Sequence, residues 1–456
     1  MRFAHRTLRA IGGAAMVGAL VLGTATAASA DATRDGQWQN KAFDIDAVHK
    51  VATGKGTTVA VIDGGVNGGQ PDLSGNVLPG KRCSDGQQAD QDTTDNHGTG
   101  MAALVAGHGH GAGNSQGVLG MAPEAKILPV DFWATDGDTA EDGRKAACTW
   151  DDAIRYSVDQ GADVLSISIG SGFANDATKK AVAYAVAKGA VVVYASGNEG
   201  IEESSSLGNL PGVVMVGGST KNGTPWADQN YAKQLMLTAP AEGITVPTAD
   251  GSYEDADGNT QQGEYLTTDG TSMSAAIASG TFALLKQKYP DYTPGQLVNR
   301  VIKSTYIAKS VDKSKLPDAT HGYGDLSPLK ALTANIPKGG ANGPWDLSSL
   351  PKASGKDKAA GNSSDTEAAS DSSDSGSSNV FLYVGIGIAA LVVIVVVIVL
   401  VTRNKNNRGG PGGPGGPGAP GTMPPHAYQQ GGYPPQPQQP GPYGQQQPPQ
   451  WGPPRQ

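Results

Sequence analysis

The sequence predicts an α/β fold in which a mostly parallel central sheet is covered by helices on both faces, followed by one C-terminal transmembrane helix. Two patterns indicate this. In the first 336 residues, short β-branched apolar runs alternate with segments of helical spacing, which is typical of parallel sheets. Further on, FLYVGIGIAALVVIVVVIVLV is apolar or glycine throughout and is long enough to cross about 30 Å of hydrocarbon as a helix.

The two ends of the chain have the composition of targeting and linking segments. A basic start, a short apolar stretch and a final Ala-Ser-Ala are typical of a secretory signal peptide. Arg403, Lys405 and Arg408 directly follow the apolar segment, which places the tail in the cytoplasm and the preceding domain outside the membrane. We therefore expect a signal peptide at 1–30, an extracytoplasmic domain at 31–336, a flexible Ser/Gly/Asp-rich linker at 337–379, a transmembrane helix at 380–402 and a disordered Pro/Gly/Gln-rich cytoplasmic tail at 403–456.

Charge and cysteine content narrow the function of the extracytoplasmic domain. The whole chain has a formal net charge of −8, and no basic run interrupts residues 31–336, so nucleic acid is not an expected partner. Both cysteines, Cys83 and Cys148, lie in this domain. Because the surroundings outside the cell are oxidising, the two are candidates for one disulfide, although their spacing alone does not show that they meet.

Five apolar runs within the domain have the length and composition of strands buried on both faces. They lie at residues 57–63, 125–130, 163–169, 190–195 and 213–217. Between them, helical spacing relates two sets of residues: Met101, Leu104, Val105 and His108, and then Ala181, Ala185 and Val186. Gly189 follows the second set and is placed as a helix C-cap.

Three polar residues stand at the ends of these predicted elements. Asp63 follows a buried strand, His97 begins a helical segment, and Ser272 opens the helix that starts in GTSMSAAIASG. Each has an ordinary structural interpretation as a turn carboxylate, a capping histidine or a serine N-cap. In parallel sheets, however, ligands gather beyond the carboxyl ends of the strands, and a hydroxyl at a helix N-terminus is favoured when negative charge develops beside it.

The order Asp63, His97, Ser272 is one of the orders in which catalytic triads occur on unrelated folds. The α/β-hydrolase order does not fit these residues, and GTSMS lacks the second glycine of a G-x-S-x-G elbow. Asn198 ends another buried strand in VVVYASGN. Its amide can form an Asx turn or donate a hydrogen bond to an oxyanion, and the sequence around it leaves both open.

Taken jointly, these motifs resemble the subtilase family of serine proteases. VAVIDGGV is similar to the aspartate motif of that family, HGTGMAALVAG to its histidine motif, ASGN to its oxyanion motif and GTSMSAA to its serine motif. The similarity extends over residues 38–332. It implies a subtilisin-like fold and a catalytic domain at 31–336 that hydrolyses peptide bonds through an acyl-enzyme.

The resemblance also implies a role for each candidate residue. The expected roles are orienting carboxylate for Asp63, general base and acid for His97, nucleophile for Ser272 and oxyanion donor for Asn198. The backbone of Ser168, Ile169 and Gly170 is expected to pair with an extended substrate as a strand would. No cofactor is required for this chemistry. Calcium stabilises many subtilases, but its ligands cannot be matched to positions here, and His108 and His110 lack a third ligand for a metal site.

The chain departs from the family pattern at three places. Gly64 stands where Thr or Ser usually follows the aspartate, and Gly100-Met101 replaces a common His-Val. A proline that normally follows the serine motif is missing, because Ala275, Ala276 and Ile277 continue the segment. We expect these changes to alter fit and rigidity around the site while the triad residues remain present.

A narrower resemblance is to the mycosins, which are membrane-anchored subtilases associated with type VII secretion. The signal peptide, the short QWQNKAFDIDAVHKVATGKG lead-in, the two cysteines and the single C-terminal span are similar to that group. The implied function is a single-pass, outward-facing endopeptidase of the cell membrane that acts on protein or peptide substrates, including type VII secretion substrates or components. A scaffolding subunit with dispensable proteolysis and a surface sensor that signals through its tail are the alternatives.

Overall fold

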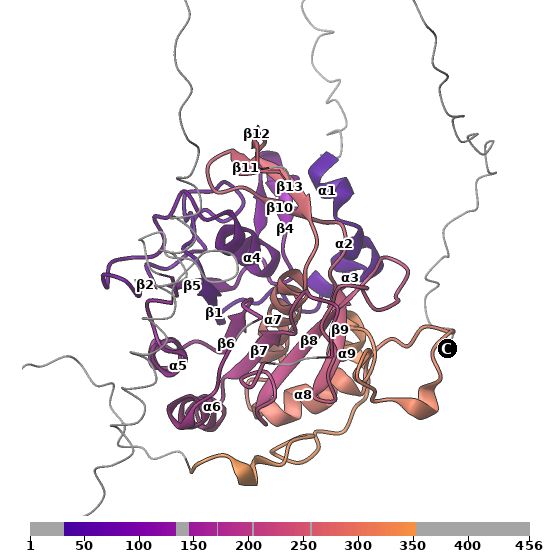
Figure 1. Cartoon of the computed structure of the whole chain (residues 1–456). Coiled ribbons are helices and arrows are strands. Elements are labelled where there is room, and N and C mark those ends of the chain that lie inside the picture. The colour runs from indigo at the N-terminus through magenta and orange to yellow at the C-terminus, as the bar shows by residue number, and fades with distance from the viewer. Residues whose placement is uncertain (1–31, 134–145, 171, 203–204, 256–257, 353–456) are drawn as a thin grey trace, which may run out of the picture. The chain divides into compact units, whose positions relative to one another are not determined.

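The computed structural model describes residues 32–133, 146–170, 172–202, 205–255 and 258–352 (Figure 1). Its centre is a seven-stranded sheet in the order β2-β5-β1-β6-β7-β8-β9, and every neighbouring pair of strands in it is parallel. These strands span Thr58–Asp63 (β1), Lys81–Arg82 (β2), Lys126–Asp131 (β5), Val164–Ile167 (β6), Val191–Ala195 (β7), Val213–Ser219 (β8) and Leu235–Pro240 (β9).

All five strands expected from the sequence lie in this sheet, so the predicted α/β class with a mostly parallel sheet is confirmed. The two edge strands, β2 and β9, were not predicted. β2 has only two residues, Lys81 and Arg82, and carries no apolar run. β9 reads LMLTAP, a short apolar stretch that does not by itself distinguish a strand from a helix.

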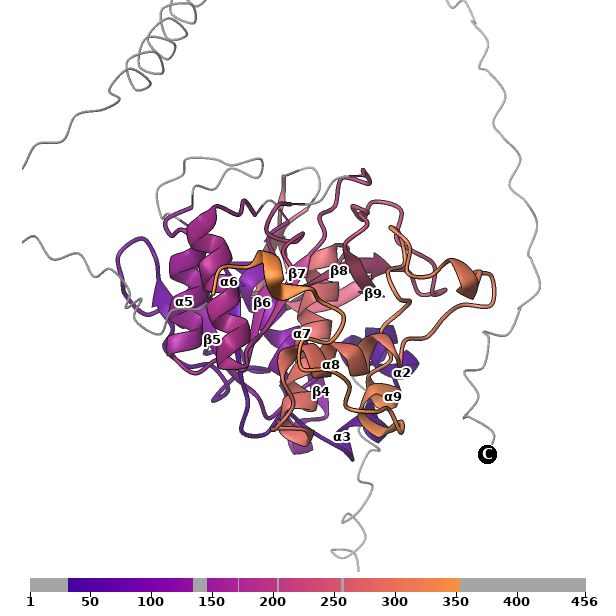
Figure 2. The same ribbon diagram turned by 90° about the horizontal axis from the view of Figure 1, so that it is seen from below.

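Helices cover both faces of the sheet (Figure 2). α5 (Trp150–Asp159) and α6 (Asp176–Lys188) pack side by side on one face, where Ile62, Leu165 and Tyr194 are completely buried. α4 (Asn96–Ala106) and α7 (Thr271–Lys288) cover the opposite face. Alternating strand residues therefore contribute to two separate cores, which explains why each strand is apolar along its whole length.

The ends of two helices show how local sequence determines their length. Gly189 caps α6 in the left-handed conformation with φ of 90°, as predicted. α4 ends at Ala106, and Gly107 turns into extended backbone. His108 therefore lies in β3 (His108–His110), which pairs with β4 (Gln116–Leu119), and does not extend the α4 face as the helical spacing had suggested.

The lead-in forms three short helices, α1 (Ala32–Gly36), α2 (Trp38–Ala42) and α3 (Ile45–His49). The Arg34 side chain donates to the carbonyl oxygens of Asn114, Gln116 and Gly117. Gln37 is completely buried and exchanges two hydrogen bonds with the backbone of Leu119. The lead-in is thus part of the folded domain and is bound along β4.

Two antiparallel strand pairs and two further helices complete the described fold. One pair joins β10 (Ile244–Pro247) to β13 (Tyr265–Thr268), and the other joins β11 (Ser252–Glu254) to β12 (Thr260–Gln262). α8 (Pro294–Ile302) begins with a capping box between Thr293 and Gln296, and α9 (Pro328–Thr333) packs near it. Three single 3-10 turns lie at Ala112–Asn114, Lys313–Lys315 and Leu347–Ser349.

The first part of the expected flexible linker is folded against the domain. Lys338 donates to the carbonyl of Asp291 at 3.2 Å, and Gln296 of α8 donates to the carbonyl of Gly339 at 3.2 Å. Trp345 and Leu350 pack on the two hydrophobic cores. Trp345 and Leu350 thus bury apolar surface, which the Gly/Ser-rich composition of the segment does not suggest. The domain boundary expected at residue 336 is therefore corrected to at least residue 352.

The expected signal peptide, the rest of the linker, the transmembrane helix and the tail lie outside the described residues, as does the second unit of the chain, 361–456. Within the described ranges, no helix has the length and apolar character needed to cross a membrane.

Candidate active site

The carboxyl edge of the sheet brings the predicted residues to three neighbouring strands. Asp63 is the last residue of β1, Ser168 directly follows β6, and Asn198 lies three residues beyond the end of β7. Because β1, β6 and β7 are adjacent and parallel, their ends meet at one edge. α7 begins at the same place, since Ser272 and Thr271 contact Ser168 and Asn198.

Asp63 and His97 are joined by a hydrogen bond. Nδ1 of His97 lies 2.8 Å from Oδ1 of Asp63, and the same carboxylate oxygen accepts from the backbone N–H of Gly64 at 2.7 Å. The Asp63 side chain is 2% exposed, whereas that of His97 is 38% exposed. A rigid buried strand thus holds the carboxylate, and the imidazole it orients remains accessible from solvent.

Ser272 is the second residue of α7 and is 7% exposed. Gly270 is the N-cap of this helix, and its φ of 151° lies in a region that favours glycine. The Ser272 hydroxyl donates to the carbonyl oxygen of Ser168 at 3.0 Å. Two residues on, the Ser274 hydroxyl donates to the carbonyls of Ala239 and Pro240, which fixes the start of α7 against the end of β9.

The amide of Asn198 is oriented by α7. Its Oδ1 accepts from the backbone N–H and the hydroxyl of Thr271, both at 2.9 Å. Because the carbonyl half of the amide faces the helix, the Nδ2 half is directed away from those donors, and Asn198 is exposed. Both the Asx turn and the oxyanion donor were open from the sequence, and both contacts with Thr271 are made by the carbonyl oxygen of the amide.

A buried network behind Asn198 was not predicted from the sequence. Asn230 is 6% exposed, and its Oδ1 accepts from the backbone N–H groups of Glu199 and Ile201. Its Nδ2 donates to the Glu199 carboxylate, which also accepts from the backbone N–H of Asn198 at 3.0 Å. Asn230 lies in a loop after β8, and no pattern in its surrounding sequence distinguishes it from other loop asparagines.

The predicted substrate-pairing segment follows β6. Ser168 and Ile169 are 4% and 8% exposed, and a β-carbon at Gly170 would lie 2.9 Å from the α-carbon of Gly197. Gly197 itself has a φ of +106°, and a β-carbon there would lie 2.4 Å from Nδ2 of Asn230. Glycine at these two positions therefore lets the loops after β6 and β7 approach each other at the edge of the site.

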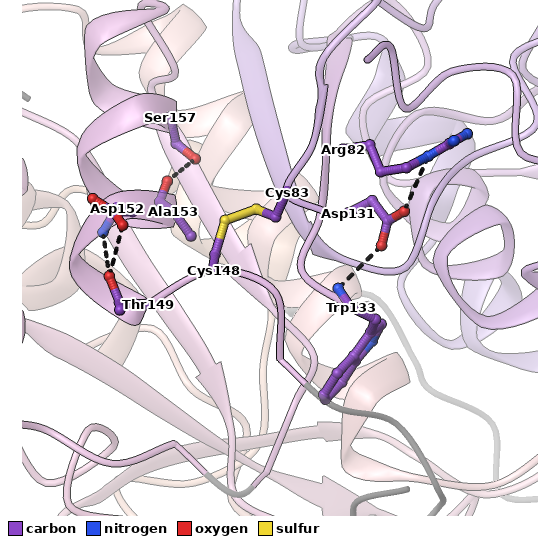
Figure 3. The surroundings of a disulfide bond; sticks show 9 residues. All are labelled: Arg82, Cys83, Asp131, Trp133, Cys148, Thr149, Asp152, Ala153 and Ser157. Atoms are coloured by element: carbon purple, nitrogen blue, oxygen red, sulfur yellow. Dashed lines mark hydrogen bonds and ion pairs between the residues drawn. A yellow bond between two sulfur atoms is a disulfide. The ribbon is translucent and has the colours of Figure 1, made fainter. Parts of the chain in front are cut away.

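Beside the site, Asp131 ends β5 and is the register partner of Asp63 on β1. Burial raises its pKa from 3.8 to about 6, and the nearby charges of Asp92 and Asp95 add to this increase, whereas Arg82 opposes it. The Arg82 Nε lies 3.7 Å from Oδ2 of Asp131 (Figure 3).

The two cysteines form a disulfide next to this carboxylate. Cys83 and Cys148 are bonded, with their α-carbons 5.4 Å apart (Figure 3). The backbone N–H of Cys83 donates to the carbonyl of Asp131 at 2.9 Å. The bond connects the residue after β2 to the segment that leads into α5. It therefore ties the outer edge of the sheet to the helical layer beside Asp131.

Two of the departures from the family pattern have a local explanation. A β-carbon at Gly100 would lie 3.1 Å from Cβ of Val246, so glycine lets β10 pack closely on α4. α7 runs without interruption from Thr271 to Lys288, and Ala275 and Ala276 are completely buried in it. Small side chains thus allow the helix to pass through the core without the proline.

The two histidines of GHGHGAG are bound by protein groups. His110 Nδ1 lies 2.7 Å from Oδ1 of Asp72, and His108 Nε2 lies 2.9 Å from the carbonyl oxygen of Ser74. No cluster of three or more His, Cys, Asp or Glu side chains suited to a metal ion occurs in the described part of the chain.

Comparison with known proteins agrees with this arrangement. The family described as the Subtilase family matches residues 54–324. Mycosin-1 of Mycobacterium tuberculosis is 29% identical over 362 residues, which cover 70% of this chain and 77% of that protein. Thermitase of Thermoactinomyces vulgaris is 31% identical over 240 residues, covering 52% of this chain and 76% of thermitase.

Among solved structures, MycP1 from the ESX-1 type VII secretion system superimposes with a TM-score of 0.56 at 28% identity. The superposition covers 68% of this chain and 89% of the MycP1 chain. Sequence and fold therefore agree, and the chain belongs to the subtilase family of serine-type endopeptidases, with mycosins among its relatives.

Proposed function

We propose that the chain cleaves its substrates with Ser272 as nucleophile, His97 as general base and then general acid, and Asp63 as the carboxylate that orients the imidazole. The 2.8 Å contact between His97 Nδ1 and Asp63 is the observation that carries this proposal. It fixes the tautomer that bears a proton on Nδ1, which leaves Nε2 as the base.

In the first step, the Ser272 hydroxyl turns from the Ser168 carbonyl and gives its proton to Nε2 of His97 while Oγ attacks the scissile carbonyl carbon. The buried negative charge of Asp63 stabilises the imidazolium that forms. The imidazolium then protonates the leaving amine, and an acyl-enzyme remains on Ser272. Water, deprotonated by His97, attacks the ester and releases the second product.

The oxyanion of each tetrahedral intermediate is stabilised by N–H donors. Asn198 Nδ2 supplies one of them, because its carbonyl oxygen is held by Thr271 and the amide cannot rotate without losing both hydrogen bonds. We also assign the backbone of Ser168, Ile169 and Gly170 as the edge on which an extended substrate pairs. This chemistry needs no metal or organic cofactor.

Fluorophosphonate labelling of the full chain in detergent tests the triad. We expect labelling of the native chain, and complete loss of it in Ser272→Ala and His97→Ala. Ser314→Ala and His321→Ala are matched controls that should still be labelled, because Ser314 bonds Asp312 and His321 bonds Asp318. Labelling that persists in Ser272→Ala would overturn the assignment.

We further propose that the protein is anchored in the cell membrane by the apolar segment at 380–402, with the catalytic domain outside and the tail in the cytoplasm. The basic residues after this segment and the N-terminal signal-like stretch support this orientation. In intact cells, an externally added protease should remove a tag placed after residue 352 and spare a tag at the C-terminus. The opposite result would reverse the topology.

A role in type VII secretion is proposed from the similarity to mycosin-1 and to MycP1 of the ESX-1 system. Its test compares export of secretion substrates in a deletion strain complemented with the native chain or with Ser272→Ala. Loss of export or of substrate processing with Ser272→Ala supports a proteolytic role. Normal export and processing with Ser272→Ala, but not in the deletion strain, would instead support a scaffolding subunit.

A further inference from the structure

The carboxylate of Asp95 occupies the space that a side chain at position 64 would take. A β-carbon at Gly64 would lie 2.0 Å from Oδ2 of Asp95, 2.3 Å from its Cγ and 2.9 Å from its Oδ1. No L-residue with a side chain fits there unless Asp95 moves. The glycine that follows the catalytic aspartate is therefore explained by one specific neighbour.

Asp95 is also the residue that starts the helix carrying His97. Its Oδ1 accepts from the backbone N–H of Gly98 at 2.6 Å and so caps α4. Gly98 in turn packs against the loop after β1, since a β-carbon there would lie 2.4 Å from the carbonyl oxygen of Gly65. A single side chain thus contacts both the loop that follows Asp63 and the first turn that presents His97.

The charges around this contact are mostly negative. Asp63 lies on β1 and bonds His97, Asp131 lies on β5, and Asp92 accepts from the backbone N–H of Asp95 at 3.2 Å. Arg82 contributes a positive charge 3.7 Å from Asp131. Oδ2 of Asp63 is buried and has no hydrogen-bond partner among the described residues. The Asp95 carboxylate adds one more negative charge beside the first turn that presents His97.

We propose that Asp95 is a positioning residue for His97, and that Gly64 is the small residue that makes this contact possible. Asp95 holds α4 against the loop after β1, which fixes the His97 ring relative to Asp63, and its charge stabilises the imidazolium formed during catalysis. The inference rests on the proposed function, because it concerns the same histidine.

The contact itself is tested by a double-mutant cycle on the full chain. Gly64→Ser should lower the melting temperature and reduce the rate of fluorophosphonate labelling at least tenfold, because its side chain collides with Asp95. Asp95→Ser shortens the opposing side chain and keeps a capping hydroxyl. We expect the combined variant Gly64→Ser/Asp95→Ser to be more stable and to label faster than Gly64→Ser alone. Strictly additive losses would overturn the contact.

The charge is tested by Asp95→Asn, which retains the shape and the helix cap. Removing the anion disfavours the imidazolium, so the acidic limb of the labelling rate against pH should move to lower pH by about half a unit to one unit. Asp46→Asn removes one negative charge from α3 and should leave the profile unchanged. A melting-temperature change in Asp95→Asn without any change in the pH profile would overturn the catalytic part, because it would indicate a purely structural residue.

Labelling of the wild-type chain distinguishes a failure of the Asp95 proposal from a failure of the proposed function. If it is labelled and every Asp95 variant has the native pH profile, the triad assignment stands and the role of Asp95 is wrong. If the folded wild-type chain is not labelled at all, the proposed function is overturned. The proposed role of Asp95 in catalysis is then overturned as well, because it depends on that function.

Discussion

Asp131 and Asp63 lie side by side as register partners at the ends of β5 and β1. Asp63 is bonded to the imidazole of His97, whereas Asp131 accepts from the backbone N–H of Trp133 and lies near Arg82. Two carboxylates with the same position on adjacent strands therefore have different partners, and burial raises the pKa of Asp131 to about 6.

This pKa predicts how stability depends on pH. Since the pKa of Asp131 is higher in the folded chain than its reference value of 3.8, folding favours the protonated carboxyl, and this contribution is lost as the pH rises through about 6. The Asn side chain does not titrate, so the unfolding free energy of Asp131→Asn should increase relative to that of the wild type by about 2 kcal/mol between pH 4 and pH 7.5. Chemical denaturation at both pH values measures this, and a pH-independent difference would contradict it.

The orientation of Asn198 predicts the effect of removing its amide. Asn198→Ala should lower kcat on a peptide ester by about 10²- to 10³-fold with little change in KM, because the donor is used mainly in the transition state. Thr271→Val keeps the shape but removes one hydroxyl that orients the amide, so its effect should be smaller. Equal activity of Asn198→Ala and the native chain would exclude Asn198 as an oxyanion donor.

The disulfide predicts a change in global stability. Cys83 and Cys148 are separated by 65 residues, so their bond restricts a long segment of the unfolded chain. Replacing both by Ala should reduce the free energy of unfolding by about 2–4 kcal/mol. Reductant should destabilise the native chain and have no effect on the double variant. An unchanged denaturation midpoint in the double variant would argue against a stabilising role.

The corrected domain boundary predicts that residues after 336 contribute to folding. Trp345 is half-buried against the core, and Trp345→Ala in the full chain should cost about 1–3 kcal/mol in the free energy of unfolding. Ser348→Ala, which changes an exposed side chain three residues away, is the matched control. Thermal unfolding distinguishes the two, and identical melting temperatures would restore the boundary at 336.

Strand and helix positions near the site were predictable because the signals are local. The apolar run that ends at Asp63 predicted a buried strand whose end lies at the ligand-binding edge of the sheet, and the structure has β1 there. Gly189 was recognisable as a C-cap for the same reason. By contrast, two-residue β2 has no local signal, and Trp345 and Leu350 stand alone in a polar segment whose composition indicates a linker.

The sequence by itself determined the α/β class, the five central strands and the family, because apolar periodicity and ordered motifs are properties of short contiguous segments. Only the tertiary structure decided which groups meet across long separations. The Asp95 carboxylate over Gly64, the Asn230 side chain behind Asn198 and the pairing of Cys83 with Cys148 all depend on how distant loops pack. Such contacts are set by the distances between folded elements, and the spacing of residues along the chain does not encode them.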